Sequence, residues 1–418
     1  MRNFLPQITP SLRMDMRWPD GLRAFRYRNF RLFFVGQLIS LIGAWTQSTA
    51  QQWLVYDLTG SQLKLGVVVF AGFLPVLILS LFMGVIVDRF PRRRILLITQ
   101  SWFMLMAAIL AVLTFSGRIT YEYIVFIAFL TGFGNALDMP ARQAFFADLV
   151  EREDLFNAIA LNSSVFNGAR IIGPAVGGLI VARFGEAPAF AFNSISYLAV
   201  IGALLMMFLP KVKTSGDGKG LSELREGLSY LIHDRRVFGL VIMIAAFSTV
   251  SFPYLVLIPV FARDILEVGP VGYGALLAAQ GVGALIGAFG LALKGDRIPK
   301  GRVLTVSRGM LAFMIAIVAL SRIPILSMVA LVGAGFAFIS LLALTNTLIQ
   351  LLVPDPLRGR VLSSYTWALG GFFPIGSLLI GSIGDSIGAT KAALIAAGGS
   401  LLLTILGIVI FPETVKLD

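Results

Sequence analysis

Apolar residues dominate the chain in long runs of about 20 residues, which short polar connections separate. A helix of about 20 apolar residues crosses a hydrocarbon core of about 30 Å, whereas a transmembrane β-barrel would show alternating segments of about ten residues. The pattern therefore predicts an all-α integral membrane protein with twelve spanning helices. We expect these helices at residues 31–56, 62–87, 94–116, 121–148, 155–182, 187–209, 237–262, 270–293, 303–321, 325–352, 361–383 and 390–411.

Composition agrees with a membrane protein, since 57% of the 418 residues are hydrophobic and only 13% are charged. A soluble chain carries about 25% charged residues. The chain has no cysteine, which excludes disulfides and cysteine-ligated metals. The first residues do not resemble a secretory signal, because arginines and prolines precede a first span that is too long for a signal core.

Charge is distributed unevenly between the connections. With a cytoplasmic N-terminus, 27 of the 34 Lys and Arg residues fall on the cytoplasmic side, six fall outside and one lies within the membrane. The 22 acids divide as 15, 6 and 1, so the whole net charge of +12 lies on the cytoplasmic side. This is the positive-inside bias. It predicts a bacterial cytoplasmic (inner) membrane protein with both termini cytoplasmic, and it makes nucleic acid an unexpected partner.

Two sequence echoes indicate an internal repeat. The block DRFPRRRIL (88–96) recurs as DRIPKGRVL (296–304), and VFNGARIIGPAVGGLI (165–180) is echoed by YTWALGGFFPIGSLLI (365–380). The chain is therefore predicted to form two pseudo-symmetric six-helix bundles. The expected divisions are a basic cytoplasmic segment (1–30), the first bundle (31–209), a central cytoplasmic loop with an amphipathic interfacial helix (210–236), the second bundle (237–411) and a cytoplasmic tail (412–418).

These motifs resemble the major facilitator superfamily. Its loop 2–3 signature is matched by Gly84, Asp88, Arg89 and Arg92 to Arg94, with Pro91 where glycine is usual. Its antiporter pattern GPxxGG in span 5 is matched by Gly173, Pro174, Gly177 and Gly178, with Ala169 in place of the preceding glycine. The stretches TQSTAQQWLVYDLTGS, PARQAFFADLV and ARIIGPAVGG are similar to the branch that contains the enterobactin exporter and the macrolide-efflux proteins. The resemblance implies alternating access around a central cavity, lined mainly by spans 1, 4, 7 and 10.

The charged block after span 2 is predicted to act as a gate. A carboxylate at Asp88 would be stabilised by the free N–H groups and positive dipole of a nearby helix N-terminus, and span 11 is expected to begin near Ser363. Such a contact would latch the two halves. The arginines of the block can reach lipid phosphates or Asp148, or they can simply anchor topology. The gating candidates are Gly84, Asp88, Arg89, Arg92, Asp148, Asp296 and Arg297.

Glycines of the span 5 motif are expected to set how this helix packs and bends. Gly173 and Gly177 lie four residues apart and permit close approach of a neighbouring helix. Pro174 removes a backbone hydrogen bond, and together with Gly178 the set could let span 5 rock during alternating access. Tight packing alone is the alternative.

Few ionisable residues are expected deep in the membrane. Asp138 lies about 16 Å from the inner end of span 4, and Arg170 about 22 Å into span 5, at 1.5 Å per residue. Arg142 shares the face of Asp138. One interpretation is a fixed ion pair that holds spans 4 and 5 together. The other is that Asp138 titrates beside Arg170 or Arg142 and couples transport to protons.

Polar residues at mid-span depth are the candidates for substrate contact, and each of them could instead make an interhelical hydrogen bond. They are Gln47, Gln51, Arg170, Tyr254, Asn346 and Tyr365.

The favoured function is a monomeric exporter of an amphipathic small molecule, siderophore or drug-like, that works as a proton antiporter. The expected partners are that substrate and membrane lipids, and no cofactor is expected beyond the proton motive force. A lysolipid or lipid flippase on the same fold and a non-transporting membrane sensor are the alternatives. An enzyme is not expected, because the sequence has no nucleotide-binding loop, metal-ligand cluster or catalytic Ser/His/Asp set.

Overall fold

The computed structural model describes residues 19–208, 229–294 and 297–417, and helices account for nearly all of them. The helices of the N-terminal half are η1 (Asp20–Arg26), α1 (Arg28–Thr59), α2 (Gln62–Arg89), α3 (Arg92–Phe115), α4 (Tyr121–Leu149), η2 (Arg152–Asp154), α5 (Leu155–Phe184) and α6 (Ala187–Met206). The C-terminal half contains α8 (Arg235–Val250), η3 (Phe252–Leu257), α9 (Ile258–Val260), η4 (Phe261–Ile265), α10 (Gly269–Lys294), α11 (Lys300–Leu320), α12 (Pro324–Leu352), α13 (Asp355–Ile387), α14 (Ala389–Ile410) and α15 (Pro412–Val415).

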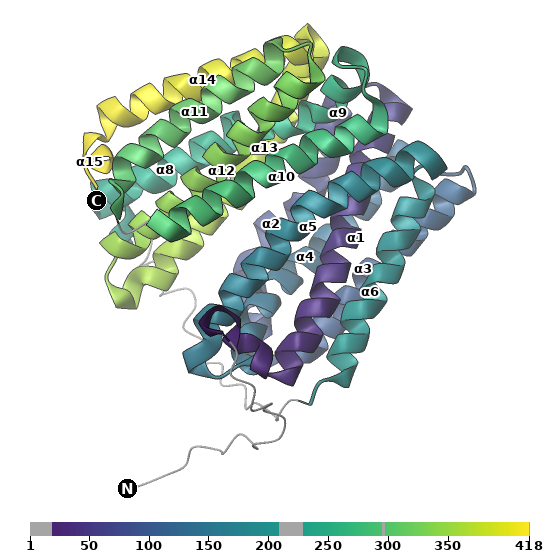
Figure 1. Ribbon diagram of the computed structural model, residues 1–418, viewed down its shortest axis with the longest axis horizontal. Coiled ribbons are helices and arrows are strands. Elements are labelled where there is room, and N and C mark those ends of the chain that lie inside the picture. The colour runs from purple at the N-terminus through teal and green to yellow at the C-terminus, as the bar shows by residue number, and fades with distance from the viewer. Residues whose placement is uncertain (1–18, 209–228, 295–296, 418) are drawn as a thin grey trace, which may run out of the picture.

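Eleven of the twelve predicted spans are, among the described residues, long and apolar enough to cross a membrane. The twelfth is α1, a continuous helix of 32 residues that contains Gln47, Gln51 and Gln52 in its middle. These polar residues lower its hydropathy, and α1 lies inside the N-terminal half, where it packs against α5 and α6 (Figure 1). The polar span is therefore sheltered by its neighbours, and the predicted all-α fold is confirmed.

Most boundaries differ from the predicted ones by a few residues, and two of the differences have a clear local cause. The helix expected from residue 361 begins at Asp355, where Pro354 is the N-cap and Asp355 forms an ion pair of 2.6 Å with Arg358. A polar first turn thus extends the helix beyond its apolar part. The predicted span 237–262 continues to Ile265 as α8, η3, α9 and η4, because prolines at 253 and 259 interrupt the regular α-helical hydrogen bonding. Of the predicted amphipathic helix, only 229–233 and the residues after it are described.

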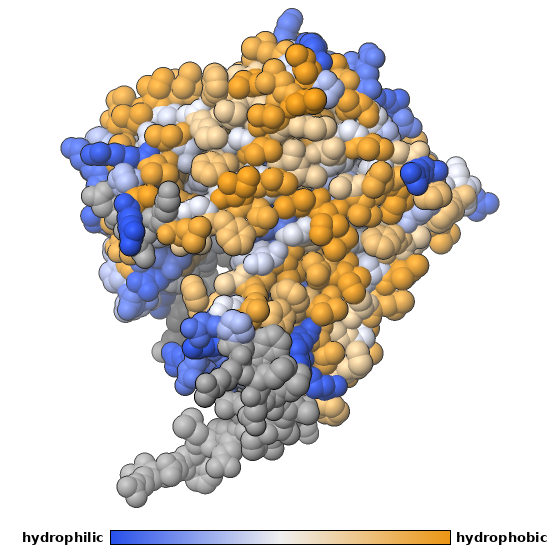
Figure 2. Space-filling model, viewed as in Figure 1, coloured by the Kyte–Doolittle hydropathy of each residue, from blue (hydrophilic) through white to orange (hydrophobic). Residues whose placement is uncertain are grey.

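The two halves pack along two pairs of helices, α2 with α13 and α5 with α10 (Figure 1). We call the end where α2 stops and α3 starts the arginine-rich end, after the arginines at 89 and 92–94. The other end, where α1 stops and α2 starts, is the distal end. In the view of Figure 2, hydrophobic residues cover most of the surface between the two ends, and hydrophilic residues gather at the ends. This distribution is the one that a bilayer requires.

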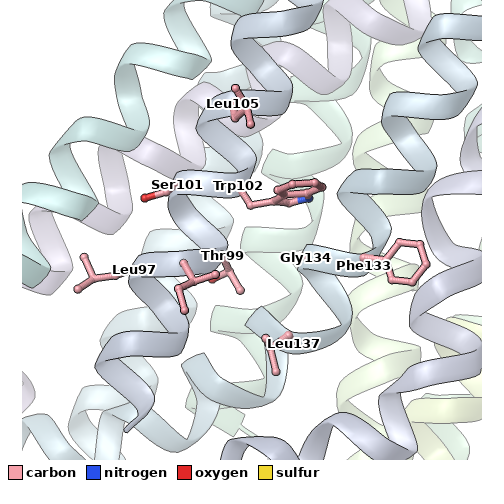
Figure 3. Close-up of a pocket in the computed structure, with 9 residues that line it drawn as sticks. Leu97, Thr99, Ser101, Trp102, Leu105, Phe133, Gly134 and Leu137 are labelled. Atoms are coloured by element: carbon pink, nitrogen blue, oxygen red, sulfur yellow. The ribbon is translucent and has the colours of Figure 1, made fainter. Parts of the chain in front are cut away.

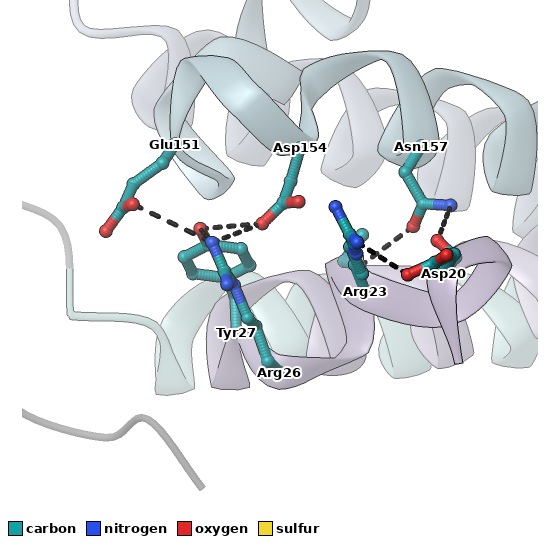
Figure 4. Close-up of polar contacts among 8 residues, drawn as sticks. Asp20, Arg23, Arg26, Tyr27, Glu151, Asp154 and Asn157 are labelled. Carbon is teal, nitrogen blue, oxygen red and sulfur yellow. Dashed lines mark hydrogen bonds and ion pairs between the residues drawn. The ribbon is translucent and has the colours of Figure 1, made fainter. Parts of the chain in front are cut away.

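The N-terminal segment is tied to the start of α5 at the arginine-rich end (Figure 4). The side chain of Asn157 accepts a hydrogen bond from the backbone N–H of Ala24 (2.8 Å), and Arg26 forms an ion pair of 2.6 Å with Asp154. Burial raises the pKa of the Tyr27 hydroxyl, so this group stays protonated and donates to Asp154 at 2.9 Å. The last third of the predicted basic segment 1–30 is therefore docked on the bundle.

Candidate transport site

An arginine lies where the two halves meet. Arg170 on α5 donates a hydrogen bond to the side-chain oxygen of Gln280 on α10 (3.2 Å), and Gln280 in turn donates to the hydroxyl of Tyr254 (3.3 Å). The guanidinium also lies 5.3 Å from the ring centroid of Phe338 and 6.0 Å from that of Trp45. Such distances give cation–π attraction, but none of these partners neutralises the charge. The arrangement provides a cation flanked by aromatic rings at the centre of the molecule.

Glycines bring the backbones of α5, α1 and α10 into contact around this arginine. A Cβ on Gly177 would lie 3.0 Å from the carbonyl oxygen of Thr46 on α1, and one on Gly178 would clash with the carbonyl of Pro270 on α10. Pro174 lacks an N–H, so the carbonyl of Arg170 has no helical partner. That oxygen faces Gly281 of α10, where a Cβ would lie 3.2 Å away.

The span 5 motif therefore places α5 against both halves. Gly173 and Gly177 face α1, and Thr46 donates a hydrogen bond of 3.0 Å to the carbonyl of Gly173. The expected close approach is present, and α5 remains one continuous helix through Pro174. Whether Gly173, Pro174, Gly177 and Gly178 also let the helix bend during transport stays a prediction.

A second polar centre lies wholly within the N-terminal half. Asp138 on α4 is buried, with 1% of its surface exposed, and its carboxylate forms an ion pair with Arg142 one turn further along the same helix. From α3, Thr99 donates to the carboxylate at 2.6 Å and Gln100 at 2.7 Å. Three donors thus stabilise the ionised form, as burial of a carboxylate requires.

The predicted ion pair between spans 4 and 5 is wrong in its partners. Asp138 pairs with Arg142 on its own helix, while Arg170 points to Gln280 across the interface between the halves. The i, i+4 spacing indicated the first contact, but the rotation of α5 that separates Arg170 from Asp138 depends on its packing with α1 and α10. Thr99 and Gln100 were missed. Their only signal was that three adjacent polar residues, 99–101, interrupt an otherwise apolar run in α3.

The other substrate candidates are mostly engaged by neighbouring groups. Gln47 accepts a hydrogen bond from Asn193 on α6 (2.7 Å), so it faces away from Arg170. Tyr365 donates to the carbonyl of Leu342 (3.1 Å), and Asn346 accepts from Gln350 on the same helix (2.6 Å). Hydrogen bonds to neighbouring groups were the alternative to substrate contact for these residues, and the structure contains such bonds between helices and within one helix. Tyr254 belongs to the cluster around Arg170, and Gln51 is half-buried on α1.

The gating candidates lie at the arginine-rich end. Arg92 contacts Asp148 at 2.7 Å and the carbonyl of Ala144 at 3.2 Å, so this arginine ties the start of α3 to the end of α4. Arg89 and Arg297 are exposed. The side chain of Asp88, the surroundings of Gly84 and the whole of Asp296 lie outside the described residues.

One element of the gate prediction is wrong. Ser363 lies eight residues inside α13, which begins at Asp355, and its hydroxyl donates to the carbonyl of Arg360 on the same helix. The free N–H groups of this helix are therefore two turns earlier than expected. A latch to the start of α13 would have to reach residues 355–358, where Asp355 already provides a negative charge.

Contacts between the halves are concentrated at the distal end. Asp385 at the end of α13 accepts hydrogen bonds from the hydroxyl of Ser61 (2.6 Å) and the backbone N–H of Gln62 (2.5 Å), the first residue of α2. Asp57 of α1 forms an ion pair of 2.8 Å with Arg263 of η4. A carboxylate of one half thus caps a helix of the other half.

A further distal contact joins the hydroxyl of Tyr56 on α1 to the carboxylate of Asp264 on η4. From this end the contacts extend along α2 and α13 to Leu77 and Gly371, and along α5 and α10 to Arg170 and Gly281. Beyond that point α5 and α10 diverge toward the arginine-rich end (Figure 1). The described residues therefore show a molecule joined at its distal end, with α5 and α10 separating toward the other.

In the described part of the chain, the eleven helices long and apolar enough to cross a membrane, together with α1, form two halves with a cation at their interface. This arrangement is typical of a membrane transporter. Residues 20–416 match the family model described as transmembrane secretion effector, MFS_3. The chain belongs to this family of the major facilitator superfamily.

Relatives of similar sequence include a siderophore transporter and two efflux proteins. The staphyloferrin A transporter of Staphylococcus aureus is 27% identical over 90% of this chain and 94% of its own length. The multidrug efflux pump Tap of Mycolicibacterium fortuitum is 28% identical over 88% of this chain and 91% of its own. Macrolide efflux protein A of Streptococcus pyogenes is 25% identical over 91% of this chain and 96% of its own length. The predicted resemblance to siderophore and macrolide exporters is confirmed.

Solved structures share the fold. A mutant of the nucleoside transporter NupG superposes with a TM-score of 0.73 over 92% of this chain and 99% of its own, at 14% identity. A bacterial homologue of the iron transporter ferroportin in an inward-facing state superposes with a TM-score of 0.71 over 93% of this chain and 99% of its own, at 16% identity. At such identities the likeness concerns the fold alone.

Proposed function

We propose that this protein exports an amphipathic small molecule, siderophore-like or drug-like, across a bacterial cytoplasmic membrane by proton antiport. It would act as a monomer with both termini in the cytoplasm, in contact with membrane lipids and without a cofactor. The positive charge at the arginine-rich end supports this orientation. The efflux relatives support export of small molecules over lipid flipping or sensing.

In this orientation the conformation is inward-facing. The distal contacts of Asp385 and Asp57 close the outer side, and α5 and α10 diverge toward the cytoplasm. Alternating access then requires these distal contacts to break while new contacts form at the arginine-rich end. The predicted latch of Asp88 would belong to that second, outward-facing state.

The observation that carries the substrate proposal is the unneutralised Arg170. Its half-buried guanidinium has Gln280, Phe338 and Trp45 as neighbours, and a cation within the membrane that has no acid among its neighbours is costly. A carboxylate or other anionic group of the substrate would relieve this cost, while the aromatic rings would contact its apolar part. The charge and the rings together fit an amphipathic anion.

Proton coupling would use the second polar centre. Protonation of Asp138 removes the charge that Arg142 balances, so the hydrogen bonds from Thr99 and Gln100 and the ion pair would rearrange. Since α3 and α4 are joined by these bonds, a proton on Asp138 would alter their packing. Arg170 would act in substrate binding, not as the partner of Asp138.

Transport by purified protein in proteoliposomes tests this function. Uptake of a radiolabelled carboxylate siderophore and of a lipophilic drug is followed after the vesicle interior is made acidic, with and without a protonophore. We expect at least one of the two to accumulate above its equilibrium level, and the protonophore to abolish this. Accumulation that resists the protonophore would overturn proton antiport. Transfer of lysolipid without accumulation of either compound would overturn the proposed substrate class.

A further inference from the structure

A groove runs between α3 and α4. It has a volume of about 610 Å³ and is lined by Leu97, Ile98, Thr99, Ser101, Trp102, Leu105, Phe133, Gly134 and Leu137 (Figure 3). Its size falls within the range of about 300–1,000 Å³ that is typical of small-molecule sites. The lining is apolar except for two hydroxyl groups.

The groove faces the membrane. Its rim residues are exposed, with 65% of Ile98, 49% of Leu105 and 43% of Phe133 accessible. Leu97 and Leu105 lie five and 13 residues after Arg92, the first residue of α3, which places them about 8 and 20 Å from the arginine-rich end. One leaflet of the hydrocarbon core is about 15 Å deep, so the groove opens to the acyl chains of the leaflet at this end.

Two aromatic side chains of α3 close the floor of the groove against α4. Trp102 donates a hydrogen bond of 2.9 Å to the carbonyl of Leu130, and it extends toward α4 in Figure 3. A Cβ on Gly134 would lie 2.5 Å from the ring of Phe103 and 3.0 Å from that of Trp102. Because glycine stands there, the rings lie directly on α4, and the space remains on the membrane side.

A free cation lies at the foot of the groove. Arg92 is engaged by Asp148, and Arg93 donates to the carbonyl of Leu205 (3.0 Å). Arg94 is exposed, and its side chain makes no hydrogen bond or ion pair with the described residues. It shares one helix face with Ile98, since the two are four residues apart, and an arginine at a membrane boundary extends toward the headgroups.

We infer that an anionic phospholipid binds here, with its phosphate on Arg94 and one acyl chain in the groove between α3 and α4. The positive charge of Arg94 at this end of the groove complements a phosphate, for which arginine is a favoured partner. The apolar lining matches a hydrocarbon chain, and the groove overlaps the depth at which the acyl chains of this leaflet lie.

The bound chain would contact the residue that connects the groove to the buried carboxylate. Thr99 lines the groove and donates its hydroxyl hydrogen to Asp138. A chain packed on Thr99 and Leu137 would hold α3 and α4 in the arrangement that keeps this hydrogen bond. This regulatory consequence rests on the proposed coupling role of Asp138, whereas the lipid site itself does not.

Fluorescence of Trp102 tests the site directly. A variant with Trp18, Trp45, Trp53 and Trp367 replaced by Phe leaves this single tryptophan. It is reconstituted in phosphatidylcholine with increasing fractions of phosphatidylglycerol that carries brominated acyl chains, which quench a tryptophan in contact. We expect quenching that saturates at a low mole fraction, while brominated phosphatidylcholine in the same range quenches weakly.

Arg94→Gln should raise the half-saturating fraction of phosphatidylglycerol about fivefold, the effect of one arginine near an anionic surface. Arg302→Gln is the matched control, because Arg302 lies at the same place in the repeated block and is exposed on α11; it should leave the value unchanged. Ser101→Phe, which places a ring in the groove, should reduce the saturable quenching.

Quenching that rises in proportion to mole fraction, equally for both lipids, would overturn the proposal, because it would reflect the lipid annulus alone. Relief of quenching by inorganic phosphate without any effect of the Ser101 substitution would also overturn it, since the cation would then bind a free anion. If the lipid saturates the site but no pH-driven transport occurs in any lipid, the proposed antiport fails and the lipid site stands.

Discussion

Thr99 and Gln100 on α3 correspond to Ser307 and Arg308 on α11, since each pair lies seven and eight residues after the first residue of its helix. In the N-terminal half, both residues bind the carboxylate of Asp138. In the C-terminal half, α12 has the same length of 29 residues as α4. Aligned end to end, it has an apolar leucine where α4 has that carboxylate.

Arg308 is nevertheless buried, with 2% of its surface exposed. Its guanidinium lies 5.8 Å from the ring centroid of Phe247, and its Nε has no hydrogen-bond partner among the described residues. The sequence prediction did not include this arginine among the charges deep in the membrane. An arginine stays charged at all physiological pH values, whereas a carboxylate can be neutralised. The comparison teaches that, among the described residues, the repeat preserved the helices but placed a buried carboxylate at this position in the N-terminal half alone.

The largest expected effect is that of Asp138→Asn. An asparagine amide cannot take up and release a proton, so accumulation of substrate driven by a pH gradient should be abolished. Substrate binding, measured by thermal shift, should remain. Glu122→Gln is the control, because Glu122 is a fully exposed acid at the start of α4. Undiminished accumulation of substrate by the Asp138 variant would mean that the carboxylate only stabilises the structure. Neither half would then supply a proton-coupling group at this position.

Arg170→Gln should weaken binding of an anionic substrate about tenfold or more, since hydrogen bonds to charged groups contribute about 1.5–3 kcal/mol. Arg170→Lys keeps the charge and should restore part of the affinity, as measured by calorimetric titration. Arg308→Met should leave affinity unchanged. Equal losses of affinity in the Arg170 and Arg308 variants would mean that positive charge in either half contributes to substrate binding.

Arg308→Met should raise the apparent melting temperature, because it removes a buried cation that no acid of the described residues balances. Met fills a similar volume and adapts to irregular spaces. Arg142→Met should instead lower the melting temperature, because it leaves the carboxylate of Asp138 without its cation. If the Arg308 variant were the less stable of the two, this arginine would have a balancing acid in another conformation.

The smallest expected effects concern the balance between conformations. Asp385→Asn weakens the cap on α2 at the distal end, and Asp88→Asn is predicted to weaken the latch at the arginine-rich end. A charge at a helix N-terminus contributes about 0.3–2 kcal/mol, so each change should shift populations without unfolding the protein.

These two substitutions should act in opposite directions, Asp385→Asn toward the outward-facing state and Asp88→Asn away from it. Because the chain contains no cysteine, pairs of spin labels at introduced cysteines can report the distances at both ends. Shifts in the same direction would contradict the assignment of the two acids to opposite states.

Much of the architecture could be predicted because it depends on one-dimensional patterns. Apolar runs place spanning helices, and the repeated block relates the two halves. Ends were predicted less well where polar turns extend a helix, as at Asp355, since hydropathy marks the hydrocarbon boundary and not the last hydrogen bond. The ion pair of Asp138 with Arg142 was available from spacing within one helix.

By itself, then, the sequence determined the fold class, the repeat and the family, and it indicated Asp138, Arg142 and Arg170 as charges within the membrane. Only the tertiary structure decided how those charges are used. It directed Arg170 to Gln280, joined Thr99 and Gln100 to Asp138, and placed Asp385 on the first residue of α2. The physical reason is that these contacts join different helices, and the rotation of each helix about its axis is fixed by glycine contacts and side-chain packing that no periodicity along a single helix encodes.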